Sequence, residues 1–372
     1  MNFVEHVIIG GGISGCLMAH HLSQRKLDFK LIEAQAILGG RIQSTEQGLD
    51  LGPTWFWPHQ SSVKVLFESL NVSFFNQYSH GDYVYQTAPN APISQGKDHQ
   101  SMLSHRTVGG MATIINALKK GITKNSIGED NIVLNSPATR VSKQENLWYI
   151  ELNNGKTLTC QTLWLAMPPR QVVSLFTSAT PEQPLLSSAL ISHLQAQQTW
   201  MSAQAKFVAV YKTAFWREAG LSGQGFSRVG PMVEINDASG VNADANSDVN
   251  SGANTDSPAA LFGFIGVPAS HRQSINKQQM IDACVAQLGK LFGEAALSPV
   301  STHYIDWANN EFIATTADIE EPSQHAHFDQ ARFKAELSRL NLGLIGSEFS
   351  QTEPGYIAGA IEHVNQQAAA LD

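Results

Sequence analysis

The sequence predicts an α/β fold, in which a parallel sheet covered by helices forms one domain and insertions into that domain form a second, α+β domain. An apolar strand at residues 7–9 runs directly into the glycine-rich turn 10–15, and a helical pattern follows. A second strand at 29–32 ends on Glu33. A strand, a helix and a parallel strand in this order form the βαβ unit of a Rossmann-type domain.

The turn has the spacing G-x-G-x-x-G, with glycines at 10, 12 and 15. Gly10 allows the tight turn, Gly12 lets backbone approach a pyrophosphate, and Gly15 lets the helix pack closely on the sheet. The helix begins near Ser14, and its free N–H groups and positive dipole end attract phosphate. Glu33 is placed to accept hydrogen bonds from an adenosine ribose. We therefore predict a bound dinucleotide, either FAD or NAD-like.

Composition and charge exclude several classes of protein. The chain has 372 residues, a net charge of −8 and no lysine- or arginine-rich tract, so we expect no nucleic-acid partner. The first strand starts within a few residues of Met1 and no apolar run reaches about eighteen residues, so we expect no signal peptide, no membrane span and a cytoplasmic location. Cys16, Cys160 and Cys284 lie far apart in apolar segments, which is typical of buried thiols in a reducing compartment. We assign no metal ligands.

Two segments after Glu33 resemble the flavin monoamine oxidase family and its wider amine-oxidase-like superfamily. They are 38–41, Leu-Gly-Gly-Arg, and 49–55, Leu-Asp-Leu-Gly-Pro-Thr-Trp. The resemblance implies that the arginine lies near the pyrophosphate, which its planar guanidinium suits, and that the second segment brings backbone and an aromatic ring to a flavin. It narrows the cofactor to FAD. The matching residues are Gly39, Gly40, Arg41, Gly52, Pro53, Thr54 and Trp55.

The middle of the chain alternates between the two predicted domains. Apolar periodicity predicts a helix at 61–70, and the run to about residue 101 is an aromatic, loop-rich excursion, in which Tyr83 and Tyr85 belong either to the sheet core or to a pocket. A helix begins after Gly110, and strands follow at 132–134, 139–141, 148–152 and 158–166. The resemblance implies that a backbone amide near Val141 contacts the adenine.

The stretch 200–216, WMSAQAKFVAVYKTAFW, carries the second part of the resemblance. Lys206 lies in an alternating strand, and Phe215 follows nine residues later, as in monoamine oxidases. There the matching lysine holds a water against flavin N5 and assists reoxidation by oxygen. A desolvated lysine favours negative charge on the reduced ring. The alternative is an edge-strand lysine that discourages aggregation.

Two further patterns precede the last domain segment. Residues 236–258 are rich in Asn, Asp, Ser, Gly and Ala, and we expect a surface insertion there. Residues 277–292 form an amphipathic helix. By the resemblance, Trp307 lies beside the flavin, although core packing is the alternative for a single tryptophan.

The end of the chain carries the last match, in the segments 344–348 and 353–362. By the resemblance, Gly346 and Glu348 lie near the ribityl-phosphate region. A helix that begins at Tyr356 and Ile357 directs its N–H groups at flavin N1 and C2=O, where they stabilise the anionic reduced ring. Tyr356 matches one of two aromatic residues that flank the amine in monoamine oxidases, and packing on the core is the alternative for it.

Two positions depart from the family. Its spacing places a second cage aromatic near Ala317, and the cysteine that some members use for covalent flavin attachment at Thr316. Because neither side chain is present, we predict non-covalent FAD and an incomplete aromatic cage.

Together these features predict a Rossmann-type FAD domain from segments 1–76, 104–176 and 306–372, and a substrate domain from 77–103 and 177–305. The predicted reaction is oxidation of a small-molecule amine by hydride transfer to flavin N5, with molecular oxygen as acceptor and hydrogen peroxide as product. We assign Lys206, Tyr356 and Trp55 to catalysis. One alternative is a flavin enzyme with a non-amine hydride donor, such as a dihydropyridine nucleotide. Another is a flavin-binding module that has lost its activity.

Overall fold

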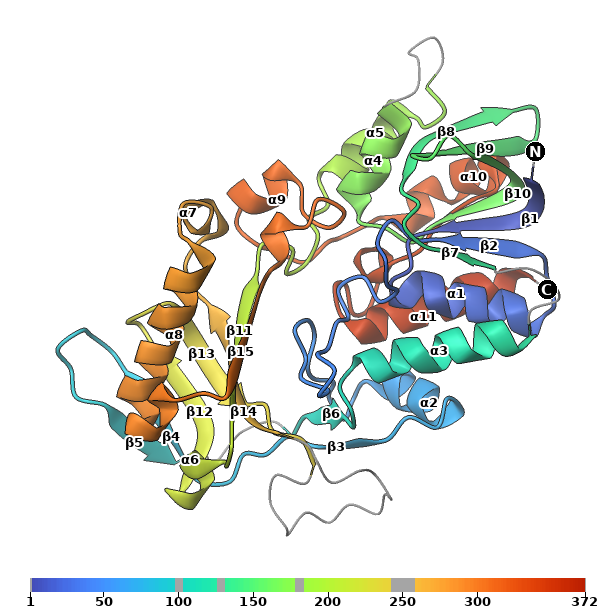
Figure 1. The fold of residues 1–372 in the computed structure, drawn as a ribbon. Helices are drawn as coiled ribbons and strands as arrows, with labels where there is room; N and C mark the ends of the chain where they lie inside the picture. Colours follow the sequence, from blue (N-terminus) through green and yellow to red (C-terminus); the bar gives the residue numbers. More distant parts are fainter. Residues whose placement is uncertain (1, 98–102, 126–130, 178–183, 242–257, 372) are drawn as a thin grey trace.

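Two seven-stranded sheets form the centres of two lobes (Figure 1). The structure is a computed structural model that describes residues 2–97, 103–125, 131–177, 184–241 and 258–371. The α/β fold predicted from the sequence is confirmed. Both chain ends lie on the lobe that contains the first sheet (Figure 1).

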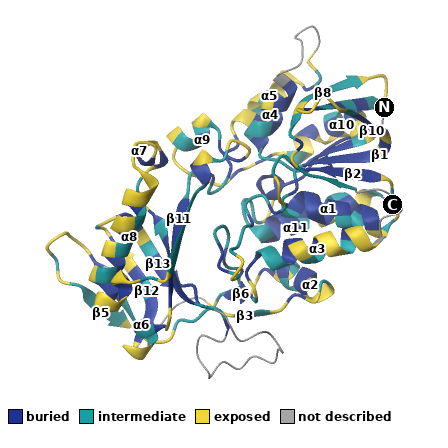
Figure 2. Ribbon diagram, in the orientation of Figure 1, coloured by how far each residue is buried: buried dark blue, intermediate teal, exposed yellow. Residues whose placement is uncertain are grey.

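The first sheet has the strand order β7-β2-β1-β10-β9-β8, with β16 paired to β10. β1 pairs in parallel with β2 and β10, and β9 joins β10 antiparallel through the hairpin at 153–156. The second half of β1 is buried, and its residues Val7 and Ile8 belong to separate hydrophobic clusters, one with the helices on each face of the sheet. Figure 2 shows the buried strands between the partly exposed helices. The strands are β1 (Asn2–Ile9), β2 (Phe29–Ile32), β7 (Ile132–Val133), β8 (Ala138–Gln144), β9 (Leu147–Leu152), β10 (Thr157–Leu165) and β16 (Leu342–Leu344).

Helices cover both faces of the first sheet. On one face pack α1 (Ile13–Gln24), α2 (Ser61–Ser69), α3 (Ala112–Asn125) and α11 (Ile357–Ala368). On the other pack α4 (Pro169–Thr177), α5 (Ser188–Gln195) and α10 (Gln330–Leu340).

Helix α5 departs from the predicted segment boundaries. We placed residues 177–305 in the substrate domain, but Leu186, Leu190 and Leu194 belong to the hydrophobic core of the first sheet. Helix α5 packs against α4 and buries its leucines against the same apolar surface, so the crossing to the second lobe comes after it.

The second sheet has the order β15-β11-β14-β13-β12-β4-β5 and is antiparallel except between β12 and β4. Helix α8 (Lys277–Phe292), whose bounds are those predicted, packs Met280, Cys284 and Leu288 on one face. The other face turns toward the first lobe, where Trp55 packs on Phe262 and Phe264. The strands are β4 (Asp82–Gln86), β5 (Ser94–Lys97), β11 (Ala205–Tyr211), β12 (Leu221–Ser227), β13 (Met232–Asp237), β14 (Ala259–Ile265) and β15 (Ser301–Asp306).

Short elements complete the fold. They are the ribbon β3 (Phe74–Asn76) with β6 (His105–Thr107), the helices α6 (Phe215–Glu218), α7 (Ala269–Arg272) and α9 (Thr316–Glu320), and the single turns η1 (Glu294–Leu297), η2 (Trp307–Asn309), η3 (Ser347–Phe349) and η4 (Ala369–Leu371). The helices within the described ranges are all too short or too polar to cross a membrane. Cys16, Cys160 and Cys284 are buried and unbridged, as predicted.

The predicted insertion at 236–258 does not begin where the composition changes. Asp237 is buried and accepts hydrogen bonds from Trp216 and Arg217. The carbonyls of Ala238 and Ser239 accept from the buried Arg106. These charged contacts fix residues 236–241 to the sheet, and the rest of the predicted insertion, 242–257, lies outside the described residues.

Candidate flavin and substrate site

A cavity of about 630 Å³ is lined by both lobes and holds most of the residues singled out in the sequence. Its wall includes the end of β1, the loops after β2 and β16, the start of α11, and the face of the second sheet that turns toward the first lobe. The predicted residues in its lining are Gly10, Gly12, Ser14, Glu33, Gly39, Gly40, Arg41, Gly52, Pro53, Thr54, Trp55, Lys206, Trp307, Gly346, Glu348, Tyr356 and Ile357.

Two predicted cofactor residues lie outside the lining. Gly15 lies behind it, where a Cβ would come within 1.9 Å of the Gly10 carbonyl oxygen, so its role is the close packing of α1 on the sheet. Val141 is fully buried in β8, and Pro137 and Ala138, nearer the start of that strand, line the cavity instead. The Val141 side chain belongs to the hydrophobic core, and the adenine contact expected of a backbone amide near it stays a prediction.

The start of α1 forms one end of the cavity. Gly12 is the N-cap, and no side chain accepts a hydrogen bond from the first N–H groups of the helix. A Cβ on Gly12 would meet only the Gly39 carbonyl, at 3.9 Å, so the cap faces open space in the cavity. Uncapped N–H groups at the positive end of a twelve-residue helix are a site for phosphate.

Glu33 lies at the carboxyl end of β2 beside this turn. Its Oε2 accepts a hydrogen bond of 2.6 Å from the Gly11 amide, and its Oε1 accepts one of 2.8 Å from the Gln35 amide. Both bonds fix the carboxylate at the edge of the cavity, and its contact with an adenosine ribose stays a prediction.

Arg41 and Glu348 form a bidentate ion pair that joins the first and last segments of the chain. The two guanidinium nitrogens of Arg41 lie 2.7 and 2.9 Å from the carboxylate oxygens, and they also donate to the Trp200 carbonyl and the Ser347 hydroxyl. Burial by itself raises the pKa of Glu348, but Arg41 and Ser347 hold that pKa below its usual value. Arg41 is therefore held by a buried carboxylate and is not a solvated surface charge.

Lys206 is buried in the wall formed by the second sheet. Strand β11 pairs with β14 on one side and β15 on the other, which excludes the edge-strand alternative. The ammonium donates to the Gly52 carbonyl at 3.1 Å and to the Thr54 hydroxyl at 2.5 Å, and it lies 4.1 Å from the centre of the Phe262 ring. Burial lowers the pKa of Lys206 to about 7, while the nearby Asp50 carboxylate acts in the opposite direction.

Aromatic rings surround the start of α11. Tyr356 is its N-cap and, like Gly12 in α1, leaves the first N–H groups without a side-chain partner. Trp57 meets the Tyr356 ring edge-on with centroids 5.8 Å apart, and His325 stacks between Tyr356 and Trp200. Trp57 and Trp200 also line the cavity. The sequence analysis assigned neither of them to the site, because the family resemblance gave a role only to neighbouring residues.

The two positions that depart from the family, Thr316 and Ala317, lie away from the cavity. Thr316 and Ala317 begin α9, which Thr315 caps and which Arg170 holds through an ion pair to Asp318. Neither residue lines the cavity. Trp307 does line it and donates to the Leu51 carbonyl at 3.2 Å.

The lining also contains a carboxylate that the sequence did not reveal. Glu234 lies in β13, next to Phe264 of β14. Its carboxylate accepts a hydrogen bond of 3.0 Å from the side-chain amide of Asn236. Tyr83 and Tyr85, by contrast, pack on each other and on Phe226 and do not line the cavity.

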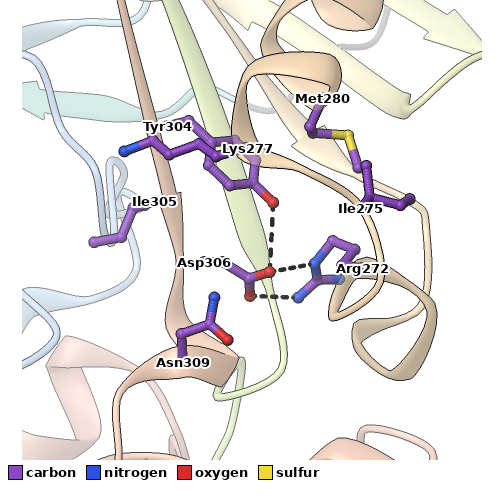
Figure 3. A pocket seen from close by; sticks show the side chains of 8 residues that line it. All are labelled: Arg272, Ile275, Lys277, Met280, Tyr304, Ile305, Asp306 and Asn309. Atoms are coloured by element: carbon purple, nitrogen blue, oxygen red, sulfur yellow. Dashed lines mark hydrogen bonds and ion pairs between the residues drawn. The ribbon is translucent and has the colours of Figure 1, made fainter.

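A second cavity, of about 280 Å³, lies between β15 and the α7–α8 region (Figure 3). Arg272 and Tyr304 both point at Asp306, and Arg272 also donates to the Val267 and Ala203 carbonyls. Arg272, Tyr304 and Asp306 therefore satisfy one another in this cavity, while the Lys277 side chain lines it without an ion pair or hydrogen bond to another described residue. No cluster of three His, Cys, Asp or Glu side chains within the described ranges is arranged to hold a metal ion.

Comparison with known proteins identifies the family. The profile described as "Flavin containing amine oxidoreductase" matches residues 90–371, and that of an NAD(P)-binding Rossmann-like domain matches residues 8–70. The chain belongs to the family of flavin-containing amine oxidoreductases. It is therefore a flavin-dependent oxidoreductase. A probable flavin-containing monoamine oxidase A from Dictyostelium discoideum is 20% identical over 96% of the chain and 94% of that relative.

A putrescine oxidase from Kocuria rosea is 26% identical over 62% of the chain and 45% of that protein. Solved structures share the fold. Cyclohexylamine oxidase from Brevibacterium oxydans has a TM-score of 0.78 at 20% identity, covering 99% of this chain and 98% of that one. A putrescine oxidase bound to putrescine has a TM-score of 0.77 at 18% identity, covering 99% of each.

The residues present fit a flavin dinucleotide. Two uncapped helix starts, at Gly12 and Ile357, face one cavity from different segments of the chain. Glu33 lies at the first and the Tyr356 ring at the second. One end thus suits an anionic, ribose-bearing group and the other a flat ring that gains negative charge on reduction.

Proposed function

We propose that this protein oxidises a small-molecule amine with non-covalently bound FAD and passes the electrons to molecular oxygen, forming an imine that water hydrolyses. The observation that carries the proposal is the position of Lys206, which is buried in the wall of the cavity. The starts of helices α1 and α11 line the two ends of the same cavity. When bound, FAD supplies the redox chemistry, in which flavin N5 takes a hydride from the amine α-carbon and oxygen then becomes hydrogen peroxide.

The protein supplies position and electrostatics. Gly12 and Ser14 would hold the pyrophosphate at the start of α1, and Glu33 would accept from the ribose hydroxyls. The start of α11 would stabilise negative charge on the reduced ring. The Arg41–Glu348 pair connects the two ends of the chain at this cavity.

Lys206 would act on the oxygen step. Its ammonium is held by Gly52 and Thr54 and is shielded from water by aromatic rings, so it offers fixed positive charge where negative charge develops. Tyr356 and Trp55 would shape the apolar space in which the neutral amine and its α-carbon approach. An amine must lose its proton before it gives up a hydride, and an apolar wall favours that neutral form.

Anaerobic mixing tests the proposal. The FAD-loaded protein is combined with primary, secondary and aromatic amines and, separately, with NADH and NADPH, while flavin absorbance is followed. Bleaching by an amine supports the proposal. Bleaching by the nicotinamide nucleotides alone would favour the non-amine hydride donor, and a flavin that nothing bleaches would favour the inactive binding module.

A further inference from the structure

Three cavity-lining side chains lie in one row across the second sheet. Lys206 of β11 is the cross-strand partner of Phe264 in β14, and Phe264 is the partner of Glu234 in β13. The three strands lie side by side (Figure 1). Cross-strand partners point to the same face, so the row runs from an ammonium through an aromatic ring to a carboxylate.

The spacing of the strands determines the distance between the two ends of this row. Neighbouring strands are about 4.8 Å apart, so the backbone at Glu234 lies about 10 Å from the backbone at Lys206. The wall between them is apolar, since Phe264 packs edge-on against Trp55 with ring centroids 6.2 Å apart. Such a wall suits an alkyl chain, and the Glu234 carboxylate lies at the end of the wall.

Glu234 is the carboxylate of this cavity that is left for a ligand. Of the three glutamates in the described lining, Glu33 accepts from two backbone amides and Glu348 is paired with Arg41. Glu234 accepts one bond from Asn236, and within the described ranges no cation pairs with it.

The position of Glu234 also lets a charged group reach it. The same row continues to Phe226 of β12, whose side chain is 42% exposed, so Glu234 stands where the wall passes from the cavity to solvent. A group that binds there keeps part of its hydration, which lowers the cost of bringing a second positive charge to the site.

We propose that Glu234 binds a second cation of the substrate, so that the enzyme prefers aliphatic amines with a distal ammonium group over monoamines of the same length. The inference rests on the proposed function and names its substrate class. A charge-assisted hydrogen bond contributes about 1.5–3 kcal/mol, which corresponds to roughly 10- to 100-fold in affinity.

The test compares butylamine and pentylamine with their diamine counterparts putrescine and cadaverine. The enzyme variants are Glu234→Gln, which keeps the shape of the side chain and can still accept from Asn236, and Glu218→Gln as a matched control. Glu218 is exposed on α6 in the same lobe and does not line the cavity. Flavin absorbance reports the folded, FAD-loaded state of each variant.

Anaerobic flavin reduction gives the preference, as the ratio of the second-order rate constant of reduction for each diamine to that for its monoamine. We expect this ratio to be well above one in the wild-type and Glu218→Gln enzymes and to fall at least tenfold in Glu234→Gln, mainly through loss of diamine activity. A ratio that Glu234→Gln leaves unchanged would overturn the inference. So would a wild-type enzyme that prefers the monoamines.

Calorimetric titration of the oxidised enzyme, without oxygen, separates this inference from the proposed function. If no amine reduces the flavin, the proposed function fails, but putrescine binding that is lost in Glu234→Gln would still support the subsite. Equal putrescine binding by wild type and Glu234→Gln would overturn it whether or not the flavin is reduced. Glu234→Asp, which keeps the charge on a shorter side chain, should fall between the two.

Discussion

Replacing Arg41 by Met should destabilise the protein more than any surface ion-pair substitution. The Glu348 side chain is 2% exposed and loses two charged hydrogen bonds, of 2.7 and 2.9 Å, when the guanidinium is removed. Breaking a buried pair from one side costs about 3–5 kcal/mol, and because Arg41 is 28% exposed we expect the lower end of that range. The unpaired carboxylate in a buried site is the cause.

The expected change in Tm follows from the size of the chain. Unfolding entropy is about 2 cal/mol/K per residue, so 372 residues give about 0.8 kcal/mol/K, and a loss of about 3 kcal/mol lowers Tm by roughly 4 °C. Thermal unfolding of FAD-free protein at pH 7 measures this without any contribution from lost cofactor contacts. The Arg140–Glu151 pair, exposed by 40% and 44%, is the control, and Arg140→Met should cost less than about 1 kcal/mol.

The pH dependence has a definite sign. Because Glu348 has a lowered pKa in the folded protein, its ion pair contributes stability that is present above the unfolded pKa of about 4.5 and is lost as pH falls through the folded value. The Tm gap between wild type and Arg41→Met should therefore narrow in acid. Glu348→Gln combined with Arg41→Met should lose less than the sum of the two single losses. Strict additivity, or an Arg41→Met loss no larger than that of Arg140→Met, would refute the reasoning.

Three further predictions concern the cofactor. Lys206→Met should slow oxygen-dependent flavin reoxidation by roughly 100-fold or more in stopped-flow measurements. The wild-type rate should fall as pH rises through the pKa of Lys206, because the cationic form of the side chain is then lost. The rate of the variant should show no such pH dependence. Gly12→Ala has room for its methyl group and should fold but bind FAD at least tenfold more weakly than wild type. Gly15→Ala, whose Cβ would lie 1.9 Å from the Gly10 oxygen, should yield little folded protein. Equal FAD affinity in Gly12→Ala and wild type would refute a phosphate site at the start of α1. Acid precipitation should leave the yellow flavin in the supernatant, and a yellow pellet would show covalent attachment.

Local patterns predicted much of the fold. Helix α8 could be predicted because its apolar periodicity reflects one buried face. The βαβ unit could be predicted because an apolar strand runs directly into a glycine-rich turn and a helix. The same holds for the hairpin at 153–156, where the turn residues are local. The motifs at Gly10 and Gly346 line one cavity because each comes just after a strand of the first sheet. Gly52 lines it from the loop between β2 and α2, where it packs closely on the Arg41 backbone.

What the sequence did not predict depends on contacts between distant segments. Glu234 is an ordinary residue of a short strand, and it reaches the cavity only because β13 and β11 are both paired to β14. Residues 236–241 look like the start of a polar insertion, yet Arg106, more than a hundred residues earlier, binds their carbonyls. Leu190 gives no sign in its own segment that it packs on the first sheet rather than the second.

The most direct test of the central claim is the product balance when oxygen is admitted to the amine-reduced enzyme. After a primary amine has bleached the flavin under anaerobic conditions, the account predicts that aeration restores the yellow colour, and that hydrogen peroxide, ammonia and the carbonyl product have then formed in equal amounts. A flavin that amines reduce but oxygen does not reoxidise would contradict oxygen as the acceptor. A flavin that no amine reduces would contradict the assignment of amine oxidation to this cavity.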